Sequence, residues 1–325
     1  MIAKYTSKGA VATGVVLAAG KGRRMGRLGR YTPKACLPVL NQPLLAHNLR
    51  MLYNIGIRKT VIVVGHYRQR VTRIARRYVP SDMALRFVEQ PKPRGIADAL
   101  YRTRELVGEW IVLVMGDTYF VPNDLGSGLN ILTNSDNGVA GVLSVRPVSD
   151  PELIRKECTV LIDDNNYLID ILEKPEAPWN NIKPCGVYFF TCRIFDAIEK
   201  TPPSFLRNEV EITDAIKTLM KLGLKVKCIQ TIQRDSNFTY PSDVLLSNLY
   251  ELRQCGLSTM IGSHTKFHPE TVLEETIVGD GSNILAPVKL KRSLMLENGR
   301  IENPGVYDGC IIGPDFIVHC DIKSS

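Results

Sequence analysis

The sequence predicts a doubly wound α/β domain with a mostly parallel sheet, followed by a short β-solenoid. Up to about residue 255, strand patterns alternate with helix patterns. Beyond residue 258, apolar residues recur with a six-residue period instead. A chain of 325 residues is long enough for two domains, which we place at 1–255 and 259–325.

Short segments with the composition of buried parallel strands define the first domain. They are apolar on both faces and rich in β-branched or aromatic residues, at 13–18, 60–64, 84–88 and 110–115. Helical patterns lie between them, at 43–54, 66–78 and 95–107. We expect further strands at 139–145, 158–163, 186–190 and 225–230, and a closing helix at 241–254. This order is typical of an open sheet with helices on both faces.

The C-terminal residues follow a period that fits neither a helix nor a simple strand. Apolar residues stand six apart at Val272, Val278, Ile284, Leu290 and Leu296, and again at Val306, Ile312 and Val318. A hexapeptide repeat predicts a left-handed β-helix of roughly three turns, each of about eighteen residues, with these side chains inward. Because a short coil leaves its ends exposed, we expect it to mediate homo-oligomerisation.

Positive charge is concentrated in the N-terminal part of the chain. Residues 1–81 contain sixteen Lys or Arg and no Asp or Glu, whereas the remainder has 25 cations and 33 anions. This asymmetry predicts an anionic ligand, a nucleotide phosphate or a nucleic acid, or else a solvated basic surface. Aromatic residues are scattered through this part rather than clustered for stacking on bases, so we do not expect nucleic acid as a partner.

Composition also indicates the compartment. None of the eight cysteines forms a CxxC pair, and no apolar run is long enough to span a bilayer. The N-terminal residues lack the apolar core of a signal peptide. We therefore expect a cytoplasmic protein with reduced cysteines and no membrane partner.

The stretch GVVLAAGKGRRMG, residues 14–26, has the features of a phosphate-binding loop. Gly20 and Gly22 permit positive φ and let backbone N–H groups approach an anion. Cationic side chains surround them, at Lys21, Arg23, Arg24, Arg27, Arg30 and Lys34. The glycine spacing matches neither a Walker loop nor a dinucleotide fingerprint. The loop therefore predicts a polyphosphate ligand bound in another way.

Several motifs in order together resemble the sugar nucleotidyltransferases, or nucleotide-sugar pyrophosphorylases. They are LAAGKGRRM, TPKACLPV, QPKPRGIADAL, VLVMGDTYF, EKP, CGVYFF, EVEITDAI and PSDVLLSN, over residues 13–250. GIADAL is most similar to the glucose-1-phosphate thymidylyl- and uridylyltransferase branch. The resemblance implies a Rossmann-like domain and Mg²⁺-dependent transfer of a nucleotidyl group from a nucleoside triphosphate, UTP or dTTP, to a sugar 1-phosphate.

The resemblance also implies site residues. The cations acting on phosphates would be Arg24, Lys34 and Lys174. The nucleotide would contact Leu17, Ala18, Ala19, Gly20, Gly22, Gln90 and Gly95, with Gln90 pairing bidentately with the base. The sugar phosphate would contact Glu173, Lys174 and Gly186. Mg²⁺ would bind Asp117 and Asn237, with Asp235 as the alternative to Asn237.

Two alternatives and one departure from the family pattern stay open. Some subunits of a translation-initiation exchange factor share this plan and act as non-catalytic scaffolds, but the motif residues Arg24, Lys34, Asp117 and Lys174 favour an enzyme. An acyltransferase activity would use a tail histidine, from His264, His268 or His319, although three turns are short for such a site. Cys158 stands where relatives often have glycine, and it would change the shape of the sugar pocket.

Overall fold

The structure, a computed structural model, describes residues 12–134, 138–204 and 208–322. The chain divides into two compact units. The first unit contains residues 1–20 and 46–235, and the second contains residues 21–45 and 236–325. The two domains expected from the sequence, with a boundary at 255–259, remain a prediction.

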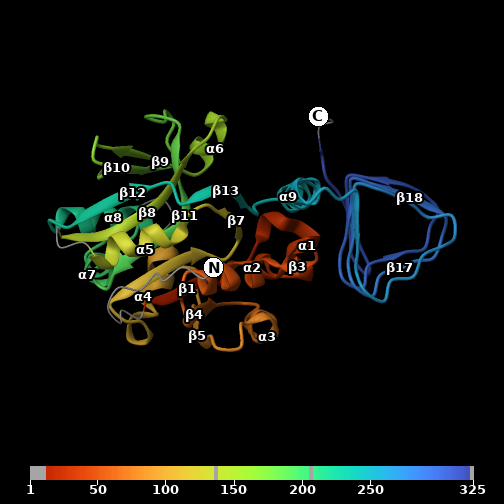
Figure 1. The fold of residues 1–325 in the computed structure, drawn as a ribbon, viewed down its shortest axis with the longest axis horizontal. Coiled ribbons are helices and arrows are strands. Elements are labelled where there is room, and N and C mark those ends of the chain that lie inside the picture. Colours follow the sequence, from red (N-terminus) through yellow and green to blue (C-terminus); the bar gives the residue numbers. More distant parts are fainter. Residues whose placement is uncertain (1–11, 135–137, 205–207, 323–325) are drawn as a thin grey trace. The chain divides into compact units, whose positions relative to one another are not determined.

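The first unit is built around a mixed sheet. Within the described residues this sheet has seven strands in the order β12-β8-β11-β6-β1-β4-β5 (Figure 1). Neighbouring strands are parallel except for β11, which runs antiparallel to both β6 and β8. The mostly parallel sheet is therefore confirmed. The strands are β1 (Thr13–Ala18), β4 (Lys59–Val64), β5 (Ala84–Glu89), β6 (Trp110–Met115), β8 (Val139–Pro147), β11 (Ile182–Thr191) and β12 (Lys225–Ile229).

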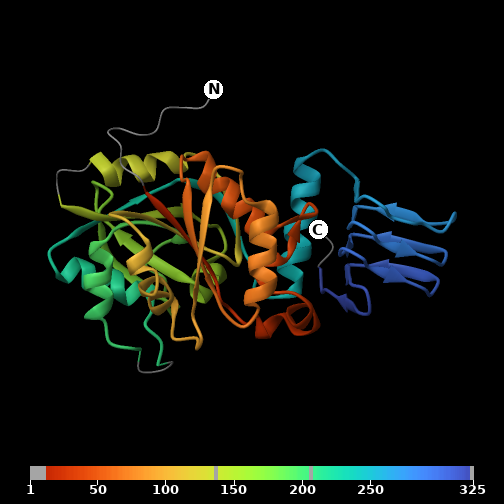
Figure 2. The same ribbon diagram turned by 90° about the horizontal axis from the view of Figure 1, so that it is seen from below.

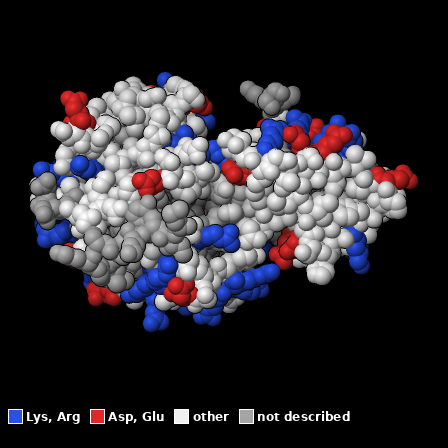
Figure 3. All heavy atoms as spheres, viewed as in Figure 1, with Lys and Arg blue, Asp and Glu red and all other residues white. Residues whose placement is uncertain are grey.

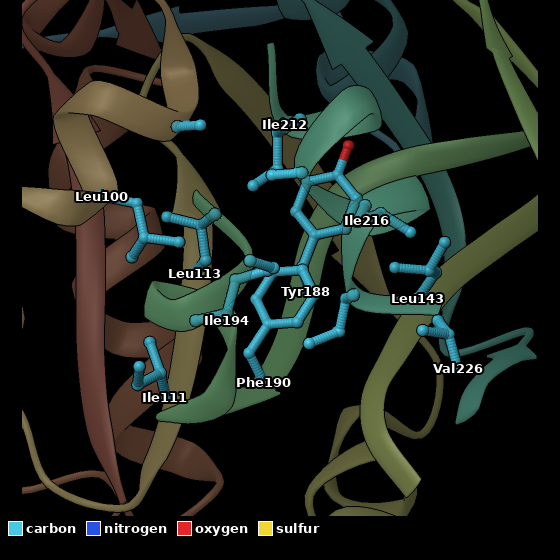
Figure 4. Packing of buried hydrophobic residues seen from close by; sticks show 14 of the residues in the cluster. Leu100, Ile111, Leu113, Leu143, Tyr188, Phe190, Ile194, Ile212, Ile216 and Val226 are labelled. Atoms are coloured by element: carbon cyan, nitrogen blue, oxygen red, sulfur yellow. The ribbon is translucent and has the colours of Figure 1, made fainter. Parts of the chain in front are cut away.

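Helices cover both faces of this sheet (Figure 2). On one face, α4 (Ile96–Tyr101), α7 (Arg193–Glu199) and α8 (Ile212–Lys221) bury a cluster that includes Leu100, Tyr188 and Ile216 (Figure 4). On the other face, α2 (Leu44–Asn54) and α5 (Leu125–Asn134) approach closely because the contacting positions are glycines. A Cβ at Gly14 would lie 2.9 Å from Leu52 Cδ1, and one at Gly128 would lie 2.4 Å from Phe189 Cε2.

Two of the predicted elements differ from the observed ones. The helix expected over 95–107 ends at Tyr101, and a 3₁₀ turn, η3 (Arg104–Leu106), follows it. There the Thr103 hydroxyl and amide both donate to the Leu100 carbonyl, which closes a tighter turn. The strand expected at 158–163 is β9 (Cys158–Ile162), but it leaves the main sheet and pairs antiparallel with β10 (Leu168–Glu173).

Smaller elements complete the first unit. The strand β7 (Thr118–Pro122) follows β6 and pairs with β13 (Ile232–Asn237), and α3 (Arg68–Tyr78) packs against β4 and β5. The helix α6 (Pro151–Lys156) begins at Asp150, whose carboxylate accepts a bond from the Glu152 amide.

The second unit contains residues 21–45, which we call the basic loop, together with α9 (Pro241–Gln254) and the C-terminal strands. The loop includes α1 (Gly26–Tyr31) and the turn between β2 (Pro38–Val39) and β3 (Gln42–Pro43). Asn248 of α9 binds this turn, because its Nδ2 donates to Pro38 O at 2.8 Å and its Oδ1 accepts from Leu40 N at 2.9 Å. The helix α9 has the bounds predicted from the sequence.

The C-terminal β segment, residues 259–319, forms three parallel ladders in which partners differ by seventeen positions. Leu273 pairs with Leu290 and Leu290 with Tyr307, for example. The ladders are consistent with the predicted β-helix, and its handedness stays a prediction. The strands are β14 (Thr259–Ile261), β15 (Val272–Glu274), β16 (Thr276–Val278), β17 (Asn283–Ile284), β18 (Val288–Lys291), β19 (Leu294–Met295), β20 (Arg300–Ile301), β21 (Gly305–Asp308) and β22 (Cys310–Ile312); β23 (Ile317–His319) pairs antiparallel with β22.

Within the parallel coils, the six-residue period is out of register at three of its positions, Val272, Leu296 and Val306. The residue beside each of them, which is Leu273, Met295 or Tyr307, lies in the core of the segment or packs against it. Val272 and Val306 are 47% and 68% exposed, whereas their neighbours Leu273 and Tyr307 pack against the segment's core. Each coil has seventeen residues, so its three inward side chains are spaced by five, six and six positions. A strict period of six would need eighteen residues for a coil and is therefore one residue too long. The corner of each coil takes a left-handed backbone, at Glu275 (φ 44°), Arg292 (φ 41°) and Gly309 (φ 65°).

Among the described helices, none combines the length and apolar character that crossing a bilayer requires.

Candidate functional site

Loops that carry predicted site residues gather at the carboxyl edge of the main sheet, within the first unit. Ala18 at the end of β1 pairs with Val64 at the end of β4, and Val64 also pairs with Glu89 at the end of β5. The Gln90 amide donates to Val64 O at 2.8 Å, and the Gly116 amide donates to Leu17 O at 3.0 Å. The residues after these strands, from Ala19 to Asp117, therefore share one edge, where open α/β sheets bind ligands.

Glycines allow these loops to approach one another. A Cβ at Gly65 would lie 2.6 Å from Ala19 O, and one at Gly116 would lie 2.3 Å from Leu17 O. Gly186 of β11 reaches the same edge, because its neighbour Val187 pairs with Val114 of β6. Its φ is +77°, and a Cβ there would lie 2.8 Å from Met115 Cγ. A larger side chain at these positions would push the loops apart.

Gln90 is buried at this edge, with 8% of its surface exposed. Its Nε2 donates to Gly95 O at 3.1 Å and to Asp98 Oδ2 at 2.8 Å. Both hydrogens of the amide nitrogen are therefore engaged, and Oε1 is left as an acceptor without a donor among the described residues. In this orientation Gln90 has one free polar atom, Oε1, and its bidentate pairing with a base stays a prediction. Gly95 has φ +100°, and a Cβ there would lie 2.3 Å from Val210 O.

The EKP motif, residues 173–175, lies at the end of β10, where this strand pairs with the start of β9. Glu173 lies opposite Cys158 in the ladder, and the Lys174 amide donates to Glu157 O at 2.8 Å. Lys174 has a left-handed backbone, φ 46°, and such strain in a residue other than glycine is typical of functional positions. Its Nζ lies 3.6 Å from Glu173 Oε1. Burial raises the pKa of the Cys158 thiol, and the nearby Glu173 and Glu157 raise it further, so this side chain acts as a small uncharged group.

A buried ionic cluster, which we call the Lys183 cluster, joins four segments of the first unit. Lys183 binds Glu157 and Asp235, and Asp235 also binds Arg146. The side chains of Lys183 and Asp235 are each 3% exposed. Burial alone lowers the pKa of Lys183, but Asp235 and Glu157 together raise it above its usual value. No sequence motif predicts this cluster, because its members come from distant parts of the chain.

The Lys183 cluster also bears on the choice of a metal ligand. Both carboxylate oxygens of Asp235 are bound to cations, Oδ1 to Arg146 and Oδ2 to Lys183. A carboxylate held in this way has little capacity left for Mg²⁺. The alternative of Asp235 is therefore not supported, and Asn237 stays as the predicted ligand.

Four of the predicted site residues belong to the second unit: Gly22, Arg24, Lys34 and Asn237. Gly22 has φ +61° and begins the 3₁₀ turn η1 (Arg23–Met25), whose Met25 amide donates to Gly22 O at 3.0 Å. The Lys34 side chain lies beside this turn, with Cγ 3.4 Å from where a Cβ of Gly22 would be. The Arg24 guanidinium lies 5.7 Å from the centre of the Tyr240 ring. Asn237 ends β13 and is exposed.

Oxygen donors of the kind that Mg²⁺ prefers are present in both units. Asp117 supplies a carboxylate and Asn237 an amide oxygen. The described residues contain no group of three or more His, Cys, Asp or Glu side chains that could hold a metal. The chemistry of these donors fits an ion that draws its other ligands from phosphate and water.

Eleven of the sixteen cations in residues 1–81 belong to two segments. The basic loop carries six of the cations, from Lys21 to Lys34, and five arginines belong to α3. Figure 3 shows blue side chains gathered over α3 and the neighbouring strand β5. Some of this charge is already paired, since Arg68 binds Glu89 at 2.9 Å. The charge asymmetry therefore combines a candidate phosphate loop with a solvated helix face.

Comparisons with known proteins agree with the motifs. A family model described as Nucleotidyl transferase matches residues 13–237. The UTP--glucose-1-phosphate uridylyltransferase AglF of Haloferax volcanii is 32% identical over 232 residues, which cover 70% of this chain and 92% of AglF. The bifunctional protein GlmU of Methanocaldococcus jannaschii is 29% identical over 263 residues, which cover 80% of this chain but only 60% of that relative.

A solved structure shares the architecture. The crystal structure of UDP-glucose pyrophosphorylase complexed with UDP-glucose aligns with a TM-score of 0.65 and 19% identity, over 75% of this chain and all of that one. At this level of identity the likeness concerns the fold alone. It agrees with a Rossmann-like α/β core built on a mostly parallel sheet.

Proposed function

The chain belongs to the nucleotidyl transferase family, and from that premise we propose that it transfers a nucleotidyl group from a nucleoside triphosphate to a sugar 1-phosphate. The proposed donors are UTP and dTTP, and the proposed acceptor is a glucose 1-phosphate-like sugar. The observation that carries the proposal is the carboxyl edge of the first unit, where Ala19, Gln90, Asp117 and Gly186 follow or flank neighbouring strands. The names of relatives such as AglF support the choice of substrates.

In the proposed reaction, a phosphate oxygen of the sugar 1-phosphate attacks the α-phosphorus of the triphosphate. The bond from the α-phosphorus to the bridging oxygen breaks, and pyrophosphate leaves with that electron pair. Both reactants are anions, so catalysis consists mainly of positioning and cationic stabilisation. We assign Arg24 and Lys34 to the triphosphate and Lys174 to the sugar phosphate, while Glu173 accepts hydrogen bonds from the sugar hydroxyls.

Asp117 and Asn237 are the proposed ligands of a divalent cation, with Mg²⁺ as the proposed ion. A bound ion would offset negative charge on the phosphates. The carboxylate of Asp117 follows β6 directly after Gly116, whose close contact with Leu17 fixes that turn. We also propose that the C-terminal β segment is a left-handed β-helix and that it mediates homo-oligomerisation.

The test is a matrix of nucleoside triphosphates against sugar 1-phosphates, scored by release of pyrophosphate with and without Mg²⁺. The variant Asp117→Ala should lower the rate on the order of 100- to 1000-fold, because it removes a charged group that acts on the phosphates in the transition state. Asp124→Ala, at an exposed aspartate before α5, is the matched control and should keep the wild-type rate.

Two outcomes would count against the proposal. Full turnover by Asp117→Ala would remove that residue from the site. No turnover by the folded wild-type protein across a broad matrix would favour a non-catalytic scaffold, which is the alternative function.

A further inference from the structure

We propose that Asp98 and Arg102 select the class of nucleobase by fixing the orientation of the Gln90 side chain. With its amide nitrogen held inside the protein, Gln90 presents only Oε1, which favours bases that carry a ring N–H at the facing edge, such as uracil and thymine. Cytosine and adenine have an unprotonated ring nitrogen at the equivalent place and are disfavoured. This inference rests on the proposed function, because it concerns the base of the same nucleotide.

The orientation of the amide follows from its neighbours. The atoms that contact the buried end of Gln90 are Gly95 O and Asp98 Oδ2, at 3.1 Å and 2.8 Å, and both are acceptors. Turning the amide over would place Oε1 against these two acceptors and lose both hydrogen bonds. Leaving such buried groups unpaired is costly, so one orientation is strongly preferred.

Arg102 holds the Asp98 carboxylate in place as a hydrogen-bond acceptor for Gln90. Its Nε donates to Asp98 Oδ2 at 3.0 Å and its Nη2 donates to Oδ1 at 3.3 Å, as an i,i+4 pair that begins in α4. The Asp98 side chain is 17% exposed and that of Arg102 is 31% exposed. Two donated bonds from a guanidinium keep both carboxylate oxygens as acceptors. Asp98 therefore accepts hydrogen bonds from both sides, from Arg102 and from Gln90.

The open end of this chain of hydrogen bonds is Gln90 Oε1. Among the described residues no side chain or amide donates to it, and it is not one of the buried atoms that lack a partner, so a ligand can reach it. Gln90 stands at the carboxyl edge, beside Val64 and next to the strand that ends at Ala18. An acceptor in this place binds the N3–H of uracil or thymine but repels the N3 lone pair of cytosine.

The experiment compares UTP with CTP in the full-length protein. In Asp98→Asn the new amide can donate to Gln90 Oε1, so the glutamine can turn its Nε2 outward toward the base. We expect the ratio of kcat/KM for UTP to that for CTP to fall at least about tenfold, mainly through KM. Arg102→Gln should change the ratio in the same direction by a smaller factor. Asp196→Asn removes a helical ion pair of similar spacing, 3.2 Å from Arg193, and should leave the ratio unchanged.

Dissociation constants of UTP and CTP, measured by calorimetry, give a second readout that does not need turnover. A wild-type protein without a preference for UTP would overturn the inference. So would an Asp98→Asn protein that is folded, as shown by circular dichroism, and keeps the wild-type ratio in binding. If Asp98→Asn does not fold, an unchanged ratio in Arg102→Gln overturns it in the same way. A UTP preference that Asp98→Asn weakens, in a protein that never releases pyrophosphate, would support the inference and refute the proposed function.

Discussion

The first unit contains two hydrogen-bonded networks of charged residues that differ in how they end. The Lys183 cluster is closed: Asp235 gives one oxygen to Arg146 and the other to Lys183, which also binds Glu157. The chain from Arg102 through Asp98 to Gln90 is open, because its last atom, Gln90 Oε1, has no donor among the described residues. Both networks are largely buried, so burial does not distinguish them.

The difference indicates what each network does. A closed network satisfies its own charges, and it joins the strands β8, β11 and β13 to the residue before β9. It therefore holds the β9–β10 pair, with Glu173 and Lys174, against the main sheet. An open network directs an unpaired acceptor at a place where a ligand is expected. We therefore expect changes in the closed network to affect mainly stability, and changes in the open one to affect mainly selectivity.

The largest expected effect is on the closed network. Lys183→Met leaves Glu157 and Asp235 without their shared cation, and removing one partner of a buried ion pair costs about 3–5 kcal/mol. We expect the free energy of unfolding, measured by urea denaturation, to fall by about that amount. Lys217→Met is the matched control, because Lys217 pairs with Asp170 at 3.0 Å on the surface, and an exposed pair contributes at most about 1 kcal/mol. Equal losses in the two variants would refute a special role for the buried cluster.

The second effect is on the open network. Gln90→Leu removes the acceptor that faces the base, so kcat/KM for UTP should fall by about 10- to 100-fold, as expected for a lost hydrogen bond in a buried site. Asp98 keeps its bonds to Arg102, so the free energy of unfolding should change by less than about 1.5 kcal/mol. A large loss of stability with an unchanged kcat/KM for UTP would mean that Gln90, like Lys183, acts mainly on stability.

Much of the fold could be predicted from the sequence where local pattern and final packing agree. The bounds of β1, β6 and α9 match the predictions, because these segments have clear apolar runs or a proline at the helix start. The helix α5 was not predicted, because Gly126 and Gly128 disfavour helices in isolation. In the folded chain Gly128 is needed at that position, since any side chain there would meet the ring of Phe189.

The candidate site was predictable to the level of motifs and no further. The motifs marked Gln90, Asp117 and Gly186, and the structure places all three at one sheet edge. The orientation of the Gln90 amide depends on Asp98 and the Gly95 carbonyl, so it could not be predicted from the motif alone, and its pairing with a base stays a prediction. The partners of Lys183 lie 26 and 52 residues away along the chain, and no local pattern indicates them.

The smallest expected effect is on exposed ion pairs of the second unit, which link the end of α9 to the C-terminal β segment and connect corners of that segment. These pairs test whether burial determines how much an ion pair contributes to stability. Arg253 binds Glu275 at 2.7 and 3.0 Å, and Arg292 binds Asp308 at 2.8 and 2.7 Å. Figure 3 shows acidic and basic side chains side by side along one edge of this segment. Hydrogen bonding to Arg253 lowers the pKa of Glu275, and hydrogen bonding to Arg292 lowers the pKa of Asp308.

A carboxyl group whose pKa is lowered by folding stabilises the protein fully when the pH is above the pKa of the unfolded state, near 4. This contribution is lost as the pH falls through the pKa of the folded state. Arg292→Gln should therefore reduce the free energy of unfolding by less than about 1 kcal/mol at pH 7, because the pair is largely exposed. The difference from wild type should shrink in 1 M salt, and it should vanish as the pH falls through the lowered folded pKa of Asp308, below which the group is protonated in both states. Thermal melts across this pH range measure it. A difference that persisted at low pH and high salt would mean that Arg292 acts through packing at its left-handed corner of the coil, and the exposed ion pair would then contribute no measurable electrostatic stability.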